Sequence, residues 1–410
     1  MNAVMRNSLF LLGGLLFLVC YFPLFAAEQA VDLILDPGGI ERTRSLVHFK
    51  INPGAYRQIY VWNRGNRFPA QVDENGDCWG IVQLPQGKAQ QYFIKPADYI
   101  KLSNLSCTRK ATKLEFKSEN VALMSYQAEP GPLPRANIKE LFIRGGYLHP
   151  INTLSGKTVT DDFPANHLHH HGVWWSWTKT EFQGRHPDFW NMGDGKGKVE
   201  FVAVDKTWSG PVQCGFISRH RFVDLTGPEP IVALNETWEV HAYLPDIMAK
   251  FWMFDLVSTQ TCATSSALKL PEYRYGGLGF RGNWAWNGKD KTDFLTSEGE
   301  HDREKGQGTR GRWCDITGLV DGQKVGIAIL CHPDNFRAPQ PMRLHPTEPF
   351  FNFAPQEAGD MEIAPGKPYV AKYRFIVHDG PMDKDKLDEL WNDYAHPIIA
   401  TWTGKAAAKE

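Results

Sequence analysis

The stretch IVALNETWEVHAY, residues 231–243, decides the fold because two kinds of side chain alternate along its whole length. One set of alternate positions is mostly apolar and comprises Val232, Leu234, Glu236, Trp238 and Val240. The other set is polar and comprises Asn235, Thr237, Glu239, His241 and Tyr243. Successive side chains of a β-strand point to opposite faces of its sheet, so a period of two predicts a long, two-faced strand of an antiparallel sandwich. The polar face either lines a concave ligand surface or meets solvent.

Other strand-like segments lie on both sides of this one. Longer ones are expected at residues 250–260, 325–331 and 370–377, and shorter ones, separated by Gly, Pro or Asn, at residues 31–35, 45–51, 58–63, 89–94, 114–117 and 121–126. The segment AEPGPLPRAN, residues 128–137, has the composition of a linker. We therefore predict a mainly β protein, with a smaller sandwich-like β domain over residues 28–128 and a larger antiparallel β domain over residues 138–397.

One helix is expected near the C-terminus. Leu387, Leu390, Trp391 and Tyr394 follow the i, i+3, i+4, i+7 spacing of a helix with one apolar face. Pro381 and Asp383 suit its start and Pro397 its end. The tail, residues 398–410, is predicted to be disordered.

The first 27 residues are typical of a secretory signal peptide. Arg6 precedes an apolar run over residues 9–25, and the small residues Ala26 and Ala27 follow it. An uncleaved N-terminal anchor is the alternative, although Gly13, Gly14 and Pro23 interrupt the run. We expect cleavage after Ala27, a periplasmic or secreted protein, and no stable membrane insertion thereafter.

The charge balance argues against one class of binding partner, and the cysteine spacing argues against a cysteine-based zinc site. The sequence has 45 Lys and Arg against 46 Asp and Glu, and no block of like charge, so a nucleic-acid partner is not expected. Six cysteines remain after cleavage, and none of them has a zinc-binding spacing. They are either buried thiols or disulfides, with Cys78 and Cys107 as one candidate pair.

Four histidines and three tryptophans crowd the stretch DDFPANHLHHHGVWWSWTKT, residues 161–180. On a strand, His167, His169 and His171 would share one face, and two imidazoles at i and i+2 can converge on one ion. His167 and His169 are therefore candidate ligands of a divalent metal such as zinc, copper or iron. A third ligand would come from elsewhere, for example from Glu239, His241, Glu272 or His332.

Acid–base chemistry is the alternative for these histidines, since imidazole titrates near neutral pH. A partner carboxylate would come from Asp161 or Asp162, or from Glu236, Glu239 or Glu272. A purely structural histidine cluster is the third interpretation.

Aromatic and basic residues near this stretch point to a sugar. Tryptophan offers an apolar face with a donor edge, which matches a sugar ring, and Trp174, Trp175, Trp177 and Trp190 lie close together in the sequence. Two further stretches carry candidate binding residues, namely YRYGGLGFRGNW with Arg281 and CHPDNFRAPQP with His332, Asn335 and Arg337. Structural ion pairs are the alternative role for the two arginines.

Four segments together resemble a bacterial family of exported proteins, catalogued as "methane oxygenase PmoA"-like. They are GGYLHPINTLSGKTVTDDFPANHLHHHGVWWSW, YGGLGFRGN, GIAILCHPDNFRAPQP and YRFIVHDG, and their order and spacing fit from Arg144 to Gly380. The methane monooxygenase subunit itself is a multi-helix membrane protein, so the resemblance does not imply an oxygenase. Positions that match the family pattern are His149, Asp162, His167, His169, His170, Gly172, Trp174, Arg281, His332, Pro333 and Arg337. The family carries Arg where this chain has His171, which argues against a ligand role for His171.

The family is similar in architecture to galactose-mutarotase-like super-sandwiches, which include epimerases, glycoside-active enzymes and lyases. Fold alone does not fix function. The acid and base motifs of the mutarotases are not recognisable in this sequence, so no catalytic assignment follows from them.

The sequence thus predicts an exported carbohydrate-active enzyme that acts by hydrolysis, elimination or epimerisation. The predicted catalytic residues are His167, His169, His170 and Asp162, with His167 and His169 as alternative metal ligands. The predicted substrate-binding residues are Trp174, Trp177, Arg281, His332, Arg337 and His149. A metal-dependent oxidoreductase and a non-catalytic glycan-binding protein are the alternative functions.

Overall fold

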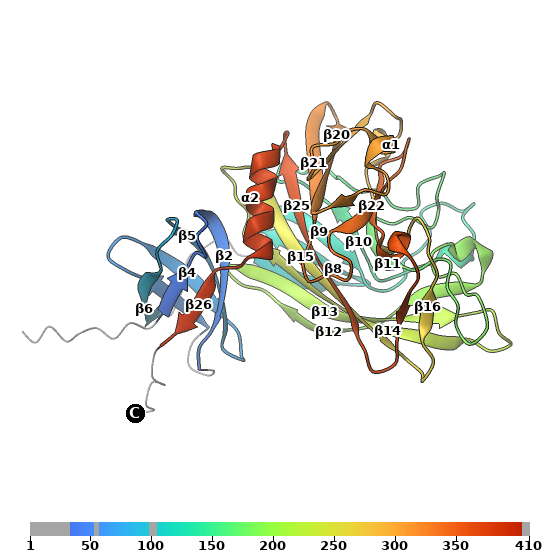
Figure 1. Ribbon diagram of the computed structural model, residues 1–410, viewed down its shortest axis with the longest axis horizontal. Helices are drawn as coiled ribbons and strands as arrows, with labels where there is room; N and C mark the ends of the chain where they lie inside the picture. Colours follow the sequence, from blue (N-terminus) through green and yellow to red (C-terminus); the bar gives the residue numbers. More distant parts are fainter. Residues whose placement is uncertain (1–32, 53–56, 98–104, 404–410) are drawn as a thin grey trace, which may run out of the picture.

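The computed structural model describes residues 33–52, 57–97 and 105–403, and its architecture is mainly β with antiparallel sheets, as predicted (Figure 1). The predicted signal peptide, residues 1–27, lies outside these residues. Among the described residues, no helix is both long and apolar enough to cross a membrane.

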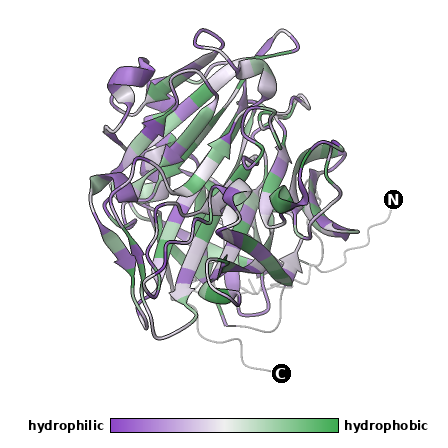
Figure 2. Cartoon of the chain, turned by 90° about the vertical axis from the view of Figure 1, so that its right-hand side faces the viewer, coloured by the Kyte–Doolittle hydropathy of each residue, from purple (hydrophilic) through white to green (hydrophobic). Residues whose placement is uncertain are grey.

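An eight-stranded sheet contains the alternating segment IVALNETWEVHAY as strand β14 (Ile231–Tyr243). In sheet order its strands are β12 (Gly197–Trp208), β13 (Gln213–Asp224), β14, β15 (Phe251–Cys262), β25 (Tyr369–Asp379), β21 (Gln323–Cys331), β20 (Trp313–Val320) and β18 (Thr292–Thr296). Leu234, Glu236 and Trp238 of β14 are buried on the inner face, whereas Glu239 and His241 lie partly exposed on the outer face. Figure 2 shows the alternation of hydrophobic and hydrophilic residues along the strands.

A nine-stranded sheet packs against that inner face. Its strands, in sheet order, are β19 (Arg310–Gly311), β22 (Gln340–Leu344), β23 (Phe350–Phe353), β17 (Gly277–Arg281), β11 (Val173–Ser176), β10 (Tyr147–Ile151), β9 (Val121–Gln127), β8 (Lys113–Ser118) and β7 (Leu105–Lys110). Aromatic rings fill the space between the two sheets, as where Tyr126 stacks on Phe216 with ring centroids 4.3 Å apart. A two-stranded sheet of β16 (Leu268–Leu270) and β24 (Met361–Ile363) lies at the edge of this sandwich.

A seven-stranded sheet forms the smaller unit and has a hydrophobic core of its own. Its strands, in sheet order, are β2 (Arg42–Lys50), β5 (Asp77–Leu84), β4 (Arg67–Val72), β3 (Gln58–Trp62), β6 (Gln90–Pro96), β1 (Leu33–Asp36) and β26 (Ile399–Trp402). Strand β26 is part of the tail that was predicted to be disordered, and it pairs with β1 because its alternating residues complete this core. The rest of that tail, residues 404–410, lies outside the described residues.

The change from the smaller to the larger unit comes earlier in the chain than predicted. Strands β7 to β9 were expected in the domain over residues 28–128, but they pair into the nine-stranded sheet. They do so because Leu114, Phe116 and Tyr126 contribute to the main core rather than to that of the smaller unit.

The predicted C-terminal helix is confirmed as α2 (Lys384–Ala395), with Asp383 capping its start. Its apolar side chains pack on the outer face of the eight-stranded sheet. Arg42 of β2 forms an ion pair with Asp393 of this helix at 2.7 Å. Helix α2 therefore lies between the two units and contacts the smaller one as well as the eight-stranded sheet (Figure 1). The remaining helices are short, namely α1 (Arg303–Gly306), η1 (Glu140–Phe142), η2 (Met192–Asp194), η3 (Trp284–Trp286) and η4 (Pro355–Ala358).

All six cysteines in the described residues are free thiols, and five of them are buried. The candidate pair, Cys78 and Cys107, is therefore not joined, and burial raises the pKa of both thiols to about 12.

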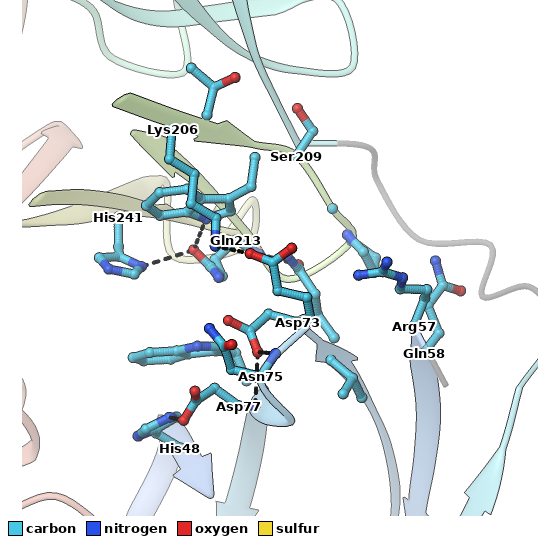
Figure 3. Close-up of a pocket in the computed structure, with 18 of the residues that line it drawn as sticks. His48, Arg57, Gln58, Asp73, Asn75, Asp77, Lys206, Ser209, Gln213 and His241 are labelled. Atoms are coloured by element: carbon cyan, nitrogen blue, oxygen red, sulfur yellow. Dashed lines mark hydrogen bonds and ion pairs between the residues drawn. The ribbon is translucent and has the colours of Figure 1, made fainter. Parts of the chain in front are cut away.

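A cleft of about 720 Å³ separates the smaller unit from the outer face of the eight-stranded sheet (Figure 3). Gln213 lies in its wall, where its side-chain oxygen accepts hydrogen bonds from the indole of Trp208 at 2.6 Å and from Nδ1 of His241 at 3.0 Å. The other ring nitrogen of His241 lies 2.7 Å from a carboxylate oxygen of Glu239. The polar face of β14 thus borders a cavity rather than open solvent at this end, but every one of these polar groups already has a partner within the chain.

Candidate histidine site

The four histidines lie in a loop that leads into β11, not on a strand. The backbone N–H of His167 donates to the carbonyl of Pro164 at 3.0 Å, and that of His170 donates to the carbonyl of His167 at 2.9 Å, so two turns follow one another. Regular pairing starts only at Val173. The expectation that residues 167, 169 and 171 share one strand face is therefore wrong, and a different set of rings converges.

His167 and His170 are the two imidazoles that stack. Their ring centroids are 4.6 Å apart and their planes differ by 11°. His169 meets both rings edge-on, at 5.7 Å from His167 and 4.7 Å from His170. His345, from the loop after β22, lies 6.3 Å from His167. Four imidazoles from two distant parts of the chain therefore gather at one place.

These imidazoles line a pocket of about 180 Å³. Its wall is aromatic, since Phe350 at the start of β23 stacks on His170 at 4.9 Å and Trp190 lies 5.2 Å from Tyr275. The lining is completed by Asn191, Arg274 and Arg343. Pockets for drug-sized ligands usually measure about 300–1,000 Å³, so this one suits a single small ring.

Glu348 lies behind His167, with its Oε2 atom 3.0 Å from the Nδ1 atom of His167. The buried guanidinium of Arg281 pairs with the same carboxylate oxygen, and Asn166 donates to the other oxygen at 2.9 Å. Burial acts to raise the pKa of Glu348, but His167 and Arg281 outweigh it and lower the pKa to about 2. The carboxylate is therefore ionised at neutral pH.

Three of the four histidines of the pocket, His169, His170 and His345, are held neutral. Burial is the largest cause, lowering the pKa of His169 to about 3, that of His345 to about 4 and that of His170 well below its usual value. The charge of Arg281 lowers all three further. A neutral imidazole can accept a proton or bind a metal ion, but it cannot act as a general acid.

Comparison with known protein families identifies the family to which the chain belongs. Residues 113–392 match the sequence profile of a family of unknown function, DUF6807. The chain belongs to this family. Nothing in the comparisons supports the PmoA-like label.

A search of curated proteins gave no match for this DUF6807 chain. Among solved structures, a glycosyl hydrolase family 38 protein from Enterococcus faecalis has a TM-score of 0.47 at 9% identity, covering 92% of this chain and 48% of its own. An alpha-mannosidase from Enterococcus faecalis V583 has the same TM-score at 10% identity, covering 92% of this chain and 46% of its own. The chain thus spans about half the length of either protein, and similarity at this level assigns neither a reaction nor a ligand.

Asp162 belongs to a separate cluster of the DUF6807 chain. It accepts hydrogen bonds from Nδ1 of His171 at 2.6 Å and from the hydroxyl of Tyr147 at 2.9 Å. Burial opposes ionisation of Asp162, but His171 outweighs it and lowers the pKa of the carboxyl. His149, a predicted substrate-binding residue, lies near this cluster and contacts the hydroxyl of Thr160 at 2.9 Å. Asp162 therefore orients His171 and not the histidines of the pocket.

The tryptophans predicted to stack on a sugar are buried. Trp174 and Trp177 are both 0% exposed. Trp174 belongs to β11, which is buried on both faces, and Trp177 follows β11 and donates its indole N–H to Gln260 in the core. Trp190, at 2% exposure, is the tryptophan that lines the pocket.

The basic residues predicted to bind substrate instead make contacts within the protein. Arg281 is 0% exposed and donates to the side chains of Asn166 and Asn287 as well as to Glu348. Arg337 donates to three backbone carbonyls of residues 355–360, and His332 packs on Tyr394 of α2. Neither Arg337 nor His332 lines the pocket.

Glu348 was missed from the sequence, as were six of the residues that line the pocket, namely Asn191, Arg274, Tyr275, Arg343, His345 and Phe350. None of the other metal ligands considered, Glu239, His241, Glu272 and His332, lies in the pocket. The sequence signal that could have identified His345 and Glu348 is the run HPTEP, residues 345–349. It places a histidine and a glutamate three residues apart in a turn between two apolar strands.

Proposed function

We propose that this DUF6807 protein is an exported carbohydrate-active enzyme that removes a proton from a carboxylate-bearing sugar, in an elimination or an epimerisation. The observation that carries this proposal is the composition of the pocket. It combines neutral imidazoles, an aromatic wall and two guanidinium groups, those of Arg274 and Arg343. A sugar ring suits the aromatic wall, and a sugar carboxylate suits arginine.

The same composition argues against hydrolysis by the usual route. Glycosidases use two carboxyl groups, about 5–5.5 Å or 6.5–9.5 Å apart. The ten lining residues, all within the described part of the chain, include neither Asp nor Glu. The nearby Glu348 is already paired with Arg281 and Asn166.

Proton removal next to a carboxylate needs a base and a cation that stabilises the enolate formed. His169 suits the first role by its position, because it lines the pocket and its ring makes no hydrogen bond among the described residues, which leaves a ring nitrogen free to accept the proton. Arg274 and Arg343 suit the second role, since a guanidinium binds both oxygens of a carboxylate. The proton passes to His169. Elimination then expels the substituent on the neighbouring carbon, with water protonating the leaving oxygen, whereas epimerisation takes a proton from water on the opposite face of the ring.

The test is a screen of the mature protein against uronic-acid and neutral oligosaccharides in deuterated water. Elimination is followed by the absorbance of the new C=C bond, and epimerisation by deuterium uptake beside the carboxylate. His169→Ala should abolish either signal, and the exposed His186, which lies outside the pocket, provides the matched control His186→Ala. Full activity of the His169→Ala variant, or release of neutral sugars without deuterium uptake, would refute the proposal.

A metal-dependent oxidoreductase is the second candidate, because ligand atoms of His167, His170 and Glu348 lie within 4.8 Å of one another. Two histidines and one carboxylate with open positions are the ligand set of many non-haem iron oxygenases. This function predicts consumption of oxygen with substrate, which an oxygen electrode measures in the same screen.

A further inference from the structure

We infer that His167, His170 and Glu348 form a binding site for one divalent transition-metal ion, with zinc as the simplest occupant. The catalytic use of this ion rests on the proposed function, but its binding does not. Imidazole nitrogen and carboxylate oxygen are the ligands that such ions accept.

The contact between His167 and Glu348 is the first observation. Nδ1 of His167 lies 3.0 Å from Oε2 of Glu348, yet it makes no hydrogen bond at that distance because the two groups are not aligned for one. Two ligand atoms that share a zinc ion, each about 2.0–2.2 Å from it, are themselves about 3–3.5 Å apart. They point at the ion rather than at each other. A close approach without hydrogen-bond alignment therefore fits two ligands of one ion.

His170 provides the second, independent observation. Its side chain is 4% exposed, lines the pocket, and has a buried Nδ1 atom without a hydrogen-bond partner. Buried polar atoms are nearly always paired, so an unpaired one indicates a group that the protein chain does not supply. Nδ1 is also the unpaired atom of His167, the ring that stacks on His170. The ligand atoms of all three residues lie within 4.8 Å of one another, a separation that small side-chain rotations can close around an ion.

The surroundings supply the outer support that metal ligands need. Asn166 and Arg281 hold the carboxylate of Glu348 from behind, and such partners fix the orientation of a ligand. The charge of Arg281 is offset by Glu348 and by nearby Asp161. His169 and His345 border the same pocket, which leaves room for a fourth ligand or for the sugar carboxylate. Catalytic metal sites keep a position open in this way.

Metal binding can be tested without any sugar. The full mature protein is stripped with a chelator, dialysed and titrated with zinc chloride in a calorimeter, and the retained metal is counted by mass spectrometry. We expect one zinc ion per chain, and His167→Ala and Glu348→Gln should each weaken binding by at least about 10-fold. His186→Ala should bind zinc as the wild type does, and circular dichroism confirms that each variant is folded.

The outcomes separate this inference from the proposed function. Binding of none of the four ions, or binding of the preferred ion that is unchanged in either variant, overturns the metal site even if uronic acids are turned over. Stoichiometric binding that both variants lose establishes the site even if no sugar reacts. Manganese, iron(II) and copper(II) titrated in the same way show which ion the site prefers, and the inference holds only if the two variants weaken binding of the preferred ion.

Discussion

Replacement of Arg281 by Met should destabilise the protein strongly, although Arg281 was first considered a substrate-binding residue. The side chain is 0% exposed and pairs with Glu348 while donating to Asn166 at 3.0 Å and to Asn287 at 2.9 Å. Removing one partner of a buried ion pair costs about 3–5 kcal/mol because the other charge is left unpaired. At about 2 °C per kcal/mol for a protein of this size, the melting temperature should fall by about 6–10 °C. Urea unfolding followed by tryptophan fluorescence measures the same loss as a free energy.

Arg274→Met is the matched control, because Arg274 lines the same pocket but is exposed. Surface substitutions usually change stability by less than about 0.5 kcal/mol. We therefore expect Arg274→Met to be as stable as the wild type and to weaken binding of an anionic sugar. Arg281→Met, in contrast, should lower the free energy of unfolding. An Arg281→Met variant within 1 kcal/mol of the wild type would refute the role of Arg281 as the buried support of Glu348.

Other predictions concern parts of the molecule away from the pocket. His378 contacts Asp315 at 3.0 Å, and this pairing outweighs burial and raises the pKa of His378, so the stabilisation is complete below pH 6.5 and is lost as pH rises through the folded-state pKa. Urea unfolding at several pH values should show this slope, and Asp315→Asn should flatten it. Gly146→Ala should lower the free energy of unfolding by about 1–3 kcal/mol or more, because φ is +76° and a Cβ atom would lie 2.8 Å from the ring of His220. Gly156→Ala has a similar φ but open space around the Cβ position, so it should lower the free energy of unfolding only through backbone strain. A reducing agent should shift the melting temperature by less than about 1 °C, since the six described cysteines are free; a large drop would show that disulfides form.

The sequence predicted the strands well because burial of one face imposes alternation on each strand separately. Strand β14 and helix α2 both appear where their periodicities placed them. Sheet membership is a different matter, since it depends on which core a strand completes. Strands β7 to β9 and β26 alternate like any others, and nothing local in them records the sheet that they join.

The site was predicted only in part, for the same reason. The histidine motif marked the correct loop, but its geometry is set by turns, so His167 pairs with His170 rather than with His169. Glu348 comes from a loop much later in the sequence and reaches His167 only through the fold of the nine-stranded sheet. The tryptophans of the motif were the most conspicuous residues, but Trp174 and Trp177 are fully buried and do not line the pocket.

The pairing of β26 with β1 has a consequence for how the chain is made. Leu33–Asp36 is synthesised long before Ile399–Trp402, yet the two strands lie side by side in the smaller sheet. Until β26 has been made, β1 is an open edge of this sheet with the apolar residues Leu33 and Leu35, and such edges recruit other chains. A nascent or truncated chain that lacks β26 therefore exposes β1 as an unpaired edge that can bind other chains, and β26 is the strand that closes this edge.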